Sequence, residues 1–144
     1  MSLRRGGSAS LQYVPPMSHS RETVTANPGP PAAGPYSHAV KANGLLFISG
    51  QVHLDPETGK LIDGSPGAKA EPCLENLTII AEAAGAKREN AVRVAVYVTD
   101  ISVFAEMNEV YAGYFEQHPP ARTTIGVAAL PMGATVEMDA IIAL

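Results

Sequence analysis

Two charged side chains fall in segments near the C-terminus that otherwise have the composition of β-strands. Arg122 stands at the start of one such segment, and Glu137 lies within the next. A charge inside a sheet requires a partner or contact with water. The two residues could act together at one ionic site, or each could form an ordinary salt bridge or face solvent.

Other candidates for chemistry are less distinctive. Tyr36 follows Gly34-Pro35, a stiff segment that could hold its hydroxyl over a cleft, although a tyrosine entering a strand also suits simple packing. Gly50 follows Ser49 at the end of an apolar strand, and its missing side chain would let a ligand approach the backbone. Asn108 lies in a predicted helix, where a surface position is the simpler interpretation. Each signal is weak by itself.

Several well-known motifs are absent from the sequence. It holds no phosphate-binding loop, no glycine-rich dinucleotide motif, no Gly-x-Ser-x-Gly turn and no His-Glu-x-x-His helix. The four histidines, at positions 19, 38, 53 and 118, lack the spacing of metal ligands. A single cysteine, Cys73, excludes an internal disulfide and a cysteine-based zinc site. We expect neither a metal nor a cofactor.

The elements that position these residues follow from hydropathy periods and turn signals. Strands are predicted at residues 37–42, 45–49, 51–54, 92–98, 122–129 and 135–143, and helices at residues 73–84 and from residue 100 or 102 to 115. This order, β-β-β-α-β-α-β-β, predicts an α/β fold with a mixed sheet and two helices on one face.

Three local expectations refine this fold. Asn43-Gly44 predicts a tight hairpin turn. Pro72 is expected in the first turn of its helix, because further in it would remove a backbone hydrogen bond. Four residues of the second helix are expected to face inward: Phe104, Met107, Tyr111 and Phe115.

The last two strands constrain how Arg122 can meet Glu137. A short turn around Pro131-Met132-Gly133 predicts a hairpin that sets Arg122 opposite Ile141 or Ile142, about 15 Å along the strand from Glu137. If the two charges act together, they should therefore meet across a subunit boundary. These strands also carry apolar residues on both faces, and no remaining element can cover the second face. We expect another subunit there.

Composition and charge exclude several classes of protein. The chain has 144 residues, of which 46% are hydrophobic and 17% charged, which fits one globular domain. Residues 1–28 carry a net charge of +2 and residues 29–144 one of −6, so the domain lacks the basic surface of a nucleic-acid-binding protein. No apolar run is long enough to span a membrane. We expect no nucleic-acid or membrane partner and a cytoplasmic location.

Residues 1–28 are expected to form a flexible arm before a domain at residues 29–144. The first 35 residues hold six of the twelve prolines and show no apolar period. Three arginines and no acidic residue among the first 21 positions fit a cleaved organelle transit peptide, whereas a natural start at Met17 explains them equally well.

Eight blocks of the sequence, taken together and in order, resemble the RidA (YjgF) family. They lie between about residues 29 and 144 and are Gly34-Pro35-Tyr36-Ser37, Phe47-Ile48-Ser49-Gly50-Gln51, Leu74-Glu75-Asn76-Leu77, Glu82-Ala83-Ala84-Gly85, Val96-Tyr97-Val98-Thr99-Asp100, Asn108-Glu109-Val110-Tyr111, Pro120-Ala121-Arg122-Thr123-Thr124 and Val127-Ala128-Ala129-Leu130-Pro131 through Val136-Glu137-Met138-Asp139-Ala140. The stretch from Arg122 to Glu137 is the most specific signature of the family.

The resemblance implies a chorismate-mutase-like fold that assembles as a homotrimer with active clefts between subunits. It also implies hydrolysis of reactive enamines and imines, of the 2-aminoacrylate and 2-iminopropanoate type, to 2-oxo acids and ammonia. The implied partners are the small imino or 2-oxo acid and further copies of the chain, and the reaction needs no cofactor.

The resemblance also implies roles for individual residues. Arg122 would hold the substrate carboxylate, for which a planar two-pronged donor is well shaped. Glu137 would position and activate the attacking water. The other matching positions shape the cleft or bind the polar atoms of the substrate: Tyr36, which we group with the catalytic residues, Ser49, Gly50, Asn108 and Thr124.

The sequence departs from the family pattern at three places. Thr124 replaces a cysteine of many members, His38 replaces a common glutamine, and Pro72 interrupts the usual polar start of the first helix. Two other functions remain open: a regulatory trimer that binds 2-oxo acids without turnover, and a ribonuclease. The acidic domain argues against the ribonuclease.

Overall fold

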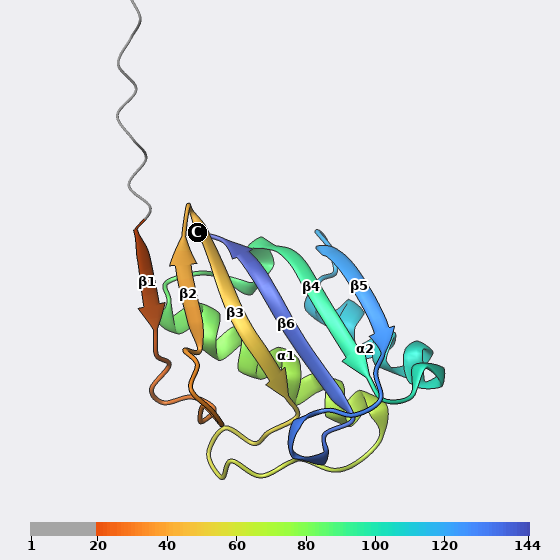
Figure 1. Cartoon of the computed structure of the whole chain (residues 1–144). Helices are drawn as coiled ribbons and strands as arrows, with labels where there is room; N and C mark the ends of the chain where they lie inside the picture. Colours follow the sequence, from red (N-terminus) through yellow and green to blue (C-terminus); the bar gives the residue numbers. More distant parts are fainter. Residues whose placement is uncertain (1–19) are drawn as a thin grey trace, which may run out of the picture.

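The computed structural model describes residues 20–144, so residues 1–19 of the predicted N-terminal arm, and with them the transit-peptide and Met17 predictions, lie outside the described residues. The described chain forms one six-stranded mixed sheet with two helices on one of its faces (Figure 1). The elements are β1 (Arg21–Val24), β2 (Ala39–Ala42), β3 (Leu45–Val52), α1 (Pro66–Ala83), β4 (Ala91–Val98), α2 (Phe104–Tyr114), β5 (Ala121–Gly126) and β6 (Val136–Ala143). The predicted fold class and the order β-β-β-α-β-α-β-β are confirmed.

The first three strands differ from the predicted set. Residues 21–24, expected in a flexible arm, form β1 and pair antiparallel with β2, so that part of the prediction is wrong. The sequence of β1 is short and mostly polar, so it shows no apolar period. It becomes a strand because it pairs with β2. The segments predicted as two strands on either side of Gly50 form the single strand β3, which continues across a shift in register between Ile48 and Gln51.

The predicted turn at Asn43-Gly44 is confirmed. Both residues have positive φ, 51° and 75°, and the turn joins β2 to β3. This combination is the signature of the tight hairpin turn whose twist matches that of paired strands.

Helix α1 begins seven residues before the predicted start. Ser65 caps it, because its side chain accepts a hydrogen bond from the Ala68 amide, and Pro66 occupies the first turn. Pro72 therefore lies inside the helix, and the expectation that it would lie in the first turn is wrong. Hydropathy periods do not reveal the first turns of α1 because the residues buried there are small. Gly67, for example, packs against Val110 of α2.

The predicted hairpin between the last two strands is also wrong. The strand order is β1-β2-β3-β6-β4-β5, so β4 separates β5 from β6. Strand β5 runs parallel to β4, while β6 runs antiparallel to both β4 and β3. The loop between β5 and β6 crosses the end of β4, where the Val127 amide bonds to Val98 and the Thr99 amide bonds to Thr135.

The hydrophobic core lies between the helices and one face of the sheet. Its fully buried members include Leu46, Leu74, Ile80, Val94, Val96, Met107, Met138 and Ile142. Tyr111 and Phe115 face this core, as predicted. Phe104 is 41% exposed, so the prediction that it faces inward is wrong for the single chain.

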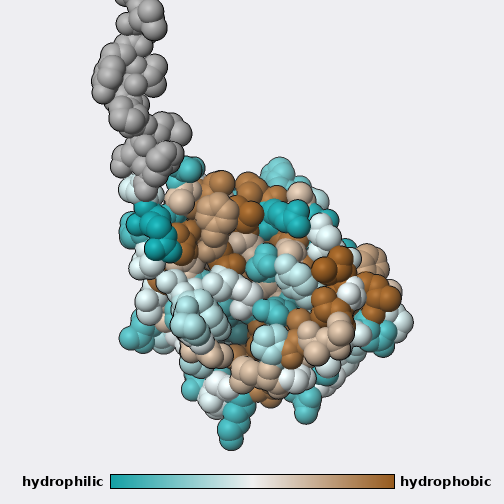
Figure 2. Space-filling model, in the orientation of Figure 1, coloured by the Kyte–Doolittle hydropathy of each residue, from teal (hydrophilic) through white to brown (hydrophobic). Residues whose placement is uncertain are grey.

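The other face of the sheet has no helix over it (Figure 1). This open face carries Phe47 of β3 and Ile125 of β5, which are 43% and 44% exposed. Apolar side chains gather over the ends of β2 and β3 and again toward β5, with polar groups between them (Figure 2). Within residues 20–144, no helix has the length and apolar character needed to cross a membrane.

Candidate active site

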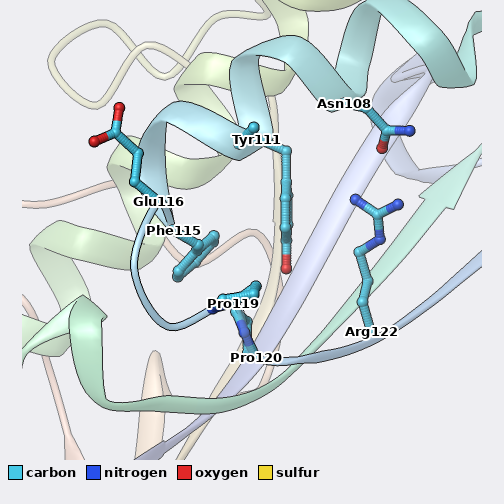
Figure 3. Close-up of a pocket in the computed structure, with 8 residues that line it drawn as sticks. Asn108, Tyr111, Phe115, Glu116, Pro119, Pro120 and Arg122 are labelled. Atoms are coloured by element: carbon cyan, nitrogen blue, oxygen red, sulfur yellow. The ribbon is translucent and has the colours of Figure 1, made fainter.

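Arg122 lies on the helix-covered side of β5, beneath α2. Its guanidinium carbon is 4.6 Å from the centre of the Tyr111 ring and 5.3 Å from that of Phe104. Among residues 20–144, no carboxylate forms an ion pair with it. The guanidinium lines a cleft of about 570 Å³ together with Asn108 and Tyr111 (Figure 3). A cation held by aromatic rings is available for an anionic ligand.

Three polar atoms around this arginine are buried without a hydrogen-bond partner in the described part of the chain. They are Oδ1 of Asn108, the hydroxyl of Tyr111 and Oγ1 of Thr124. A buried polar atom without a partner costs about 1–3 kcal/mol. Such atoms beside a free guanidinium are typical of a site that a ligand or ordered water completes.

Tyr111 carries its hydroxyl in the same cleft. Burial raises the pKa of Tyr111 to about 12, against a smaller opposing effect of the Arg122 charge. The hydroxyl is therefore protonated at neutral pH and available as a donor.

Glu137 lies on β6, on the open face, between Val52 of β3 and Tyr97 of β4. Burial raises the pKa of the Glu137 carboxyl, and the nearby Asp139 carboxylate raises it further. The Tyr97 hydroxyl donates a hydrogen bond to Asp139 Oδ2 at 2.9 Å, which fixes this second carboxylate in place. A carboxyl group with a raised pKa is suited to proton transfer near neutral pH.

Gly50 packs directly against the Glu137 carboxylate. A Cβ atom at this position would collide with Glu137 Oε1. The register shift between Ile48 and Gln51 brings the strand this close. The missing side chain therefore makes room for the carboxylate itself, whereas the sequence had suggested room for a ligand.

Ser49 and Tyr36 are linked through Ser37, in the segment before β2. The Ser49 hydroxyl donates to the Ser37 carbonyl at 2.6 Å, next to Tyr36. The Tyr36 ring is 46% exposed, and its hydroxyl accepts a hydrogen bond from the Ala33 amide at 3.0 Å. Ser49, Gly50 and Glu137 thus form one group, with Tyr36 close by in the chain.

His38, one of the departures from the family pattern, is a structural residue. Its Nδ1 accepts a hydrogen bond from the Ala26 amide, so Nε2 carries the proton and donates to the Pro30 carbonyl at 2.6 Å. The side chain is buried and holds the loop after β1.

Arg122 and Glu137 of one chain face opposite sides of the sheet. Arg122 pairs with Val94 of β4, whereas Glu137 pairs with Tyr97 of the same strand. Residues an odd number apart on a strand point to opposite faces. The Cα atoms of the two residues are about 14 Å apart, from two strand spacings and three residues along the strand. The Arg122 group and the Glu137 group of one chain are therefore separate. The prediction of about 15 Å along a hairpin is wrong in its geometry, because β4 lies between β5 and β6.

Sequence reasoning missed three residues near these groups. Phe104 and Tyr111 were assigned to the core, although their spacing with Asn108, at i, i+4 and i+7, places all three on one face of a helix. Asp139 lies two residues after Glu137, so alternation along the strand puts both carboxylates on the same face.

Comparisons with known proteins agree with this fold. Residues 27–144 match the family model described as Endoribonuclease L-PSP. A mouse protein named 2-iminobutanoate/2-iminopropanoate deaminase is 42% identical over 121 residues, which are 84% of this chain and 90% of the mouse protein. Reactive Intermediate Deaminase A, chloroplastic, from Arabidopsis thaliana is 42% identical over 141 residues, covering 98% of this chain and 75% of that protein.

A solved structure extends the comparison to the fold. The crystal structure of RidA from the Antarctic bacterium Psychrobacter sp. PAMC 21119 matches with a TM-score of 0.81 and 41% identity, covering 85% of this chain and 99% of that one. The fold and site thus define an α/β protein of the RidA (YjgF) type. The chain belongs to the Endoribonuclease L-PSP family, which includes these deaminases.

Proposed function

We propose that this protein hydrolyses small reactive α-imino acids and their enamine tautomers, of the 2-aminoacrylate and 2-iminopropanoate type, to 2-oxo acids and ammonia. The observation that carries this function is the Arg122 guanidinium, which has no carboxylate partner in the described chain and is surrounded by unpartnered polar atoms. Two relatives at 42% identity are named as deaminases, one of them for 2-iminobutanoate and 2-iminopropanoate.

The active site in this proposal forms between subunits of a homotrimer. Arg122, Asn108 and Thr124 on the helix side of one chain would meet Glu137, Gly50, Ser49 and Tyr36 of a neighbour. The opposite orientation of these two groups, the two half-sites of the proposal, supports this arrangement, because a single chain cannot bring them together. The exposed Phe47 and Ile125 give the open face an apolar surface for a partner.

The reaction follows from the chemistry of these groups. Arg122 binds the substrate carboxylate through two parallel N–H donors and so orients the imine carbon. The substrate reacts as its iminium form: Glu137 takes a proton from water as the water oxygen bonds to that carbon, and the electron pair of the C=N bond moves to nitrogen to give a neutral amine. The protonated Glu137 then donates its proton to the amine. The C–N bond breaks, ammonia leaves, and loss of the hydroxyl proton gives the 2-oxo acid.

Other cleft residues would bind the polar atoms of the substrate and the water. We assign this role to Asn108, Thr124, Ser49 and Tyr36, while Gly50 makes room for the carboxylate of Glu137. Thr124 offers a hydroxyl where many family members have a thiol, and no step above requires a thiol. Nor does any step use a metal or a cofactor. A cytoplasmic location belongs to the same proposal.

The proposal is tested by ammonia release from 2-iminopropanoate generated in the assay by an amino-acid oxidase. The wild-type chain should accelerate release, and Arg122→Ala should remove most of that acceleration. Arg122→Lys should recover little, because an ammonium lacks the two-pronged geometry. Arg88→Ala is the matched control, since Arg88 also stacks on a tyrosine, at 4.7 Å, away from the cleft.

Two results would contradict the proposal: no acceleration by the wild-type chain, or full activity in Arg122→Ala. Stabilisation of the protein by pyruvate without any ammonia release would instead favour the regulatory trimer.

A further inference from the structure

We infer that Phe104 and Tyr111 are positioning residues for Arg122: the guanidinium lies over both rings, whose contact restrains it and leaves its donor edge free for a planar carboxylate. This inference deepens the proposed function, since it rests on Arg122 as the carboxylate anchor. Neither aromatic residue is assigned a contact with the reacting atoms.

The spacing of the two rings supports the inference. Phe104 and Tyr111 lie seven residues apart on α2, or about 10 Å along the helix axis. The guanidinium carbon is 5.3 Å from one ring centre and 4.6 Å from the other. The guanidinium is therefore within cation–π distance of both rings.

Arginines are usually oriented by carboxylates or backbone carbonyls. Among the described residues, Arg122 has neither an ion pair nor a side-chain hydrogen bond, so aromatic contact is what restrains it. Attraction between a cation and the faces of aromatic rings occupies the guanidinium faces and not its N–H edge. All of its N–H donors then remain free for the substrate, which a carboxylate partner would prevent.

The two aromatic residues differ in how far they are buried. Tyr111 is buried, and its ring contacts the guanidinium from the core side of α2. Phe104 is 41% exposed and contacts the same guanidinium. Its contact with Arg122 gives this exposed ring a function. Figure 3 shows the Tyr111 ring standing beside Arg122, with Asn108 above the guanidinium.

The test compares side-chain variants by three measurements on the full chain. These are KM and kcat for 2-iminopropanoate, the dissociation constant for pyruvate, and the NMR signal of the Arg122 Nε–H group. Tyr111→Leu and Phe104→Leu should each raise KM and the pyruvate dissociation constant by about 3- to 30-fold, the range of a cation–π contact, with a smaller effect on kcat. Both should broaden the Arg122 signal.

Two further variants separate positioning from folding. Tyr111→Phe keeps the ring and removes only the hydroxyl, so the Arg122 Nε–H signal should stay as sharp as in wild type, and a broadened signal in this variant would contradict the role given to the ring. Tyr114→Leu removes the ring that stacks on Arg88 at 4.7 Å from the same helix, and it should leave KM and the Arg122 signal unchanged.

The outcomes distinguish this inference from the proposed function. Unchanged KM and pyruvate affinity in Tyr111→Leu and Phe104→Leu, with both lost in Arg122→Ala, would overturn the inference and leave the function intact. If the wild-type chain does not release ammonia, the proposed function fails. The Arg122 signal then decides alone: unchanged order in both leucine variants overturns the inference, and selective loss of order supports it.

Discussion

At the scale of single residues, the site is defined by groups that have been left without partners. Asn108 Oδ1, the Tyr111 hydroxyl and Thr124 Oγ1 are buried and unpaired in the described chain, and Arg122 has no carboxylate. A fold selected for stability alone would pair or remove such groups. Their concentration around one guanidinium marks a place where stability has been exchanged for binding.

Gly50 offers a direct test of the Glu137 half-site. Gly50→Ala should lower kcat by about 10²- to 10⁴-fold, the usual contribution of a proton-transfer group, because the new Cβ displaces the Glu137 carboxylate. The end of a glutamate side chain can move at little cost, so the thermal unfolding midpoint should change little.

Gly113→Ala is the control for this substitution. Gly113 lies in α2, and a Cβ added there would meet open space, so alanine should fit and stabilise the helix by about 0.5–1 kcal/mol. Equal loss of activity in both alanine variants, or unfolding of Gly50→Ala alone, would contradict the assigned role of Gly50.

Glu137 should reduce stability at neutral pH. Its pKa is raised in the folded state by burial and by Asp139, so the folded protein favours the protonated carboxyl. Below the pKa that Glu137 has in the unfolded chain, the carboxyl is protonated in both states and the free energy of unfolding is unaffected. As the pH rises through the higher pKa of the folded state, ionisation of Glu137 destabilises the folded protein. Glu137→Gln should therefore unfold at a higher temperature than wild type at pH 7, with a smaller difference at pH 4, while losing activity.

Thermal unfolding at the two pH values measures this effect. Glu82→Gln, which changes an exposed carboxylate on α1, should show no comparable gain. A lower midpoint for Glu137→Gln at pH 7 would show that the ionised carboxylate stabilises the fold instead.

At the scale of elements, one buried histidine ties the start of β6 to the long loop before α1. The Thr135 amide donates to His53 Nε2 at 3.0 Å, so Nδ1 carries the proton and donates to the Ile62 carbonyl at 2.9 Å. Burial lowers the pKa of His53, and the Lys69 charge lowers it further, against the hydrogen bond to Ile62 and the Asp63 charge. The neutral ring therefore anchors the segment that leads to Glu137.

This anchor should make stability depend on pH. The stabilisation from the neutral His53 ring is complete above the pKa of about 6.5 that histidine has in the unfolded chain. It is lost as the pH falls through the lower pKa of His53 in the folded protein. His53→Ala should cost about 1–3 kcal/mol at pH 7.5 and should lose less stability than wild type between pH 7.5 and 5. Urea unfolding measures both. His118→Ala, in an exposed loop, is the control, and an identical pH slope in His53→Ala and wild type would contradict the assignment.

The sequence predicted the elements whose signals are local. The positive-φ turn at Asn43-Gly44, the alternating valines of β4 and the apolar period of α1 from Cys73 onward all appear as expected. Strand β1 was missed because four mostly polar residues become a strand only by pairing with β2. The start of α1 was missed because small residues carry no hydropathy signal.

Strand order was the larger error, and it has a different cause. Turn chemistry around residues 131–133 suggests a hairpin, but whether β6 pairs with β5 or inserts beside β4 depends on contacts distant in sequence. Arg122 and Glu137 stood out as charges within predicted strands, whereas their roles, and Thr124 as a site residue, came from the family resemblance. To assign each residue to a face of the sheet, one must know the register of β4 with both β5 and β6, which the sequence alone does not reveal.

At the scale of the whole molecule, the two half-sites make assembly part of the proposed chemistry. Each chain would supply Arg122 to the site it shares with one neighbour and Glu137 to the site it shares with the other, a head-to-tail contact that closes after three copies. Sedimentation should then give a mass three times the 15.0 kDa of one chain. A monomer with full activity would contradict the arrangement.

Hybrid trimers give the sharpest test of a shared site. Arg122→Ala and Glu137→Gln chains are each expected to be inactive alone. Mixed in equal amounts and refolded together, they should regain about a quarter of wild-type activity, because one interface in four then has both intact groups. Simple mixing of folded trimers without exchange is the control, and no recovery after verified exchange would place both residues in one subunit's site.

If the two faces of the sheet contribute to different clefts, as proposed, a single chain has no complete cleft of its own. Two copies joined by one contact would hold a single complete cleft, whereas closing the ring adds two more at once. Turnover per chain should therefore fall steeply on dilution, as rings open, long before any chain unfolds.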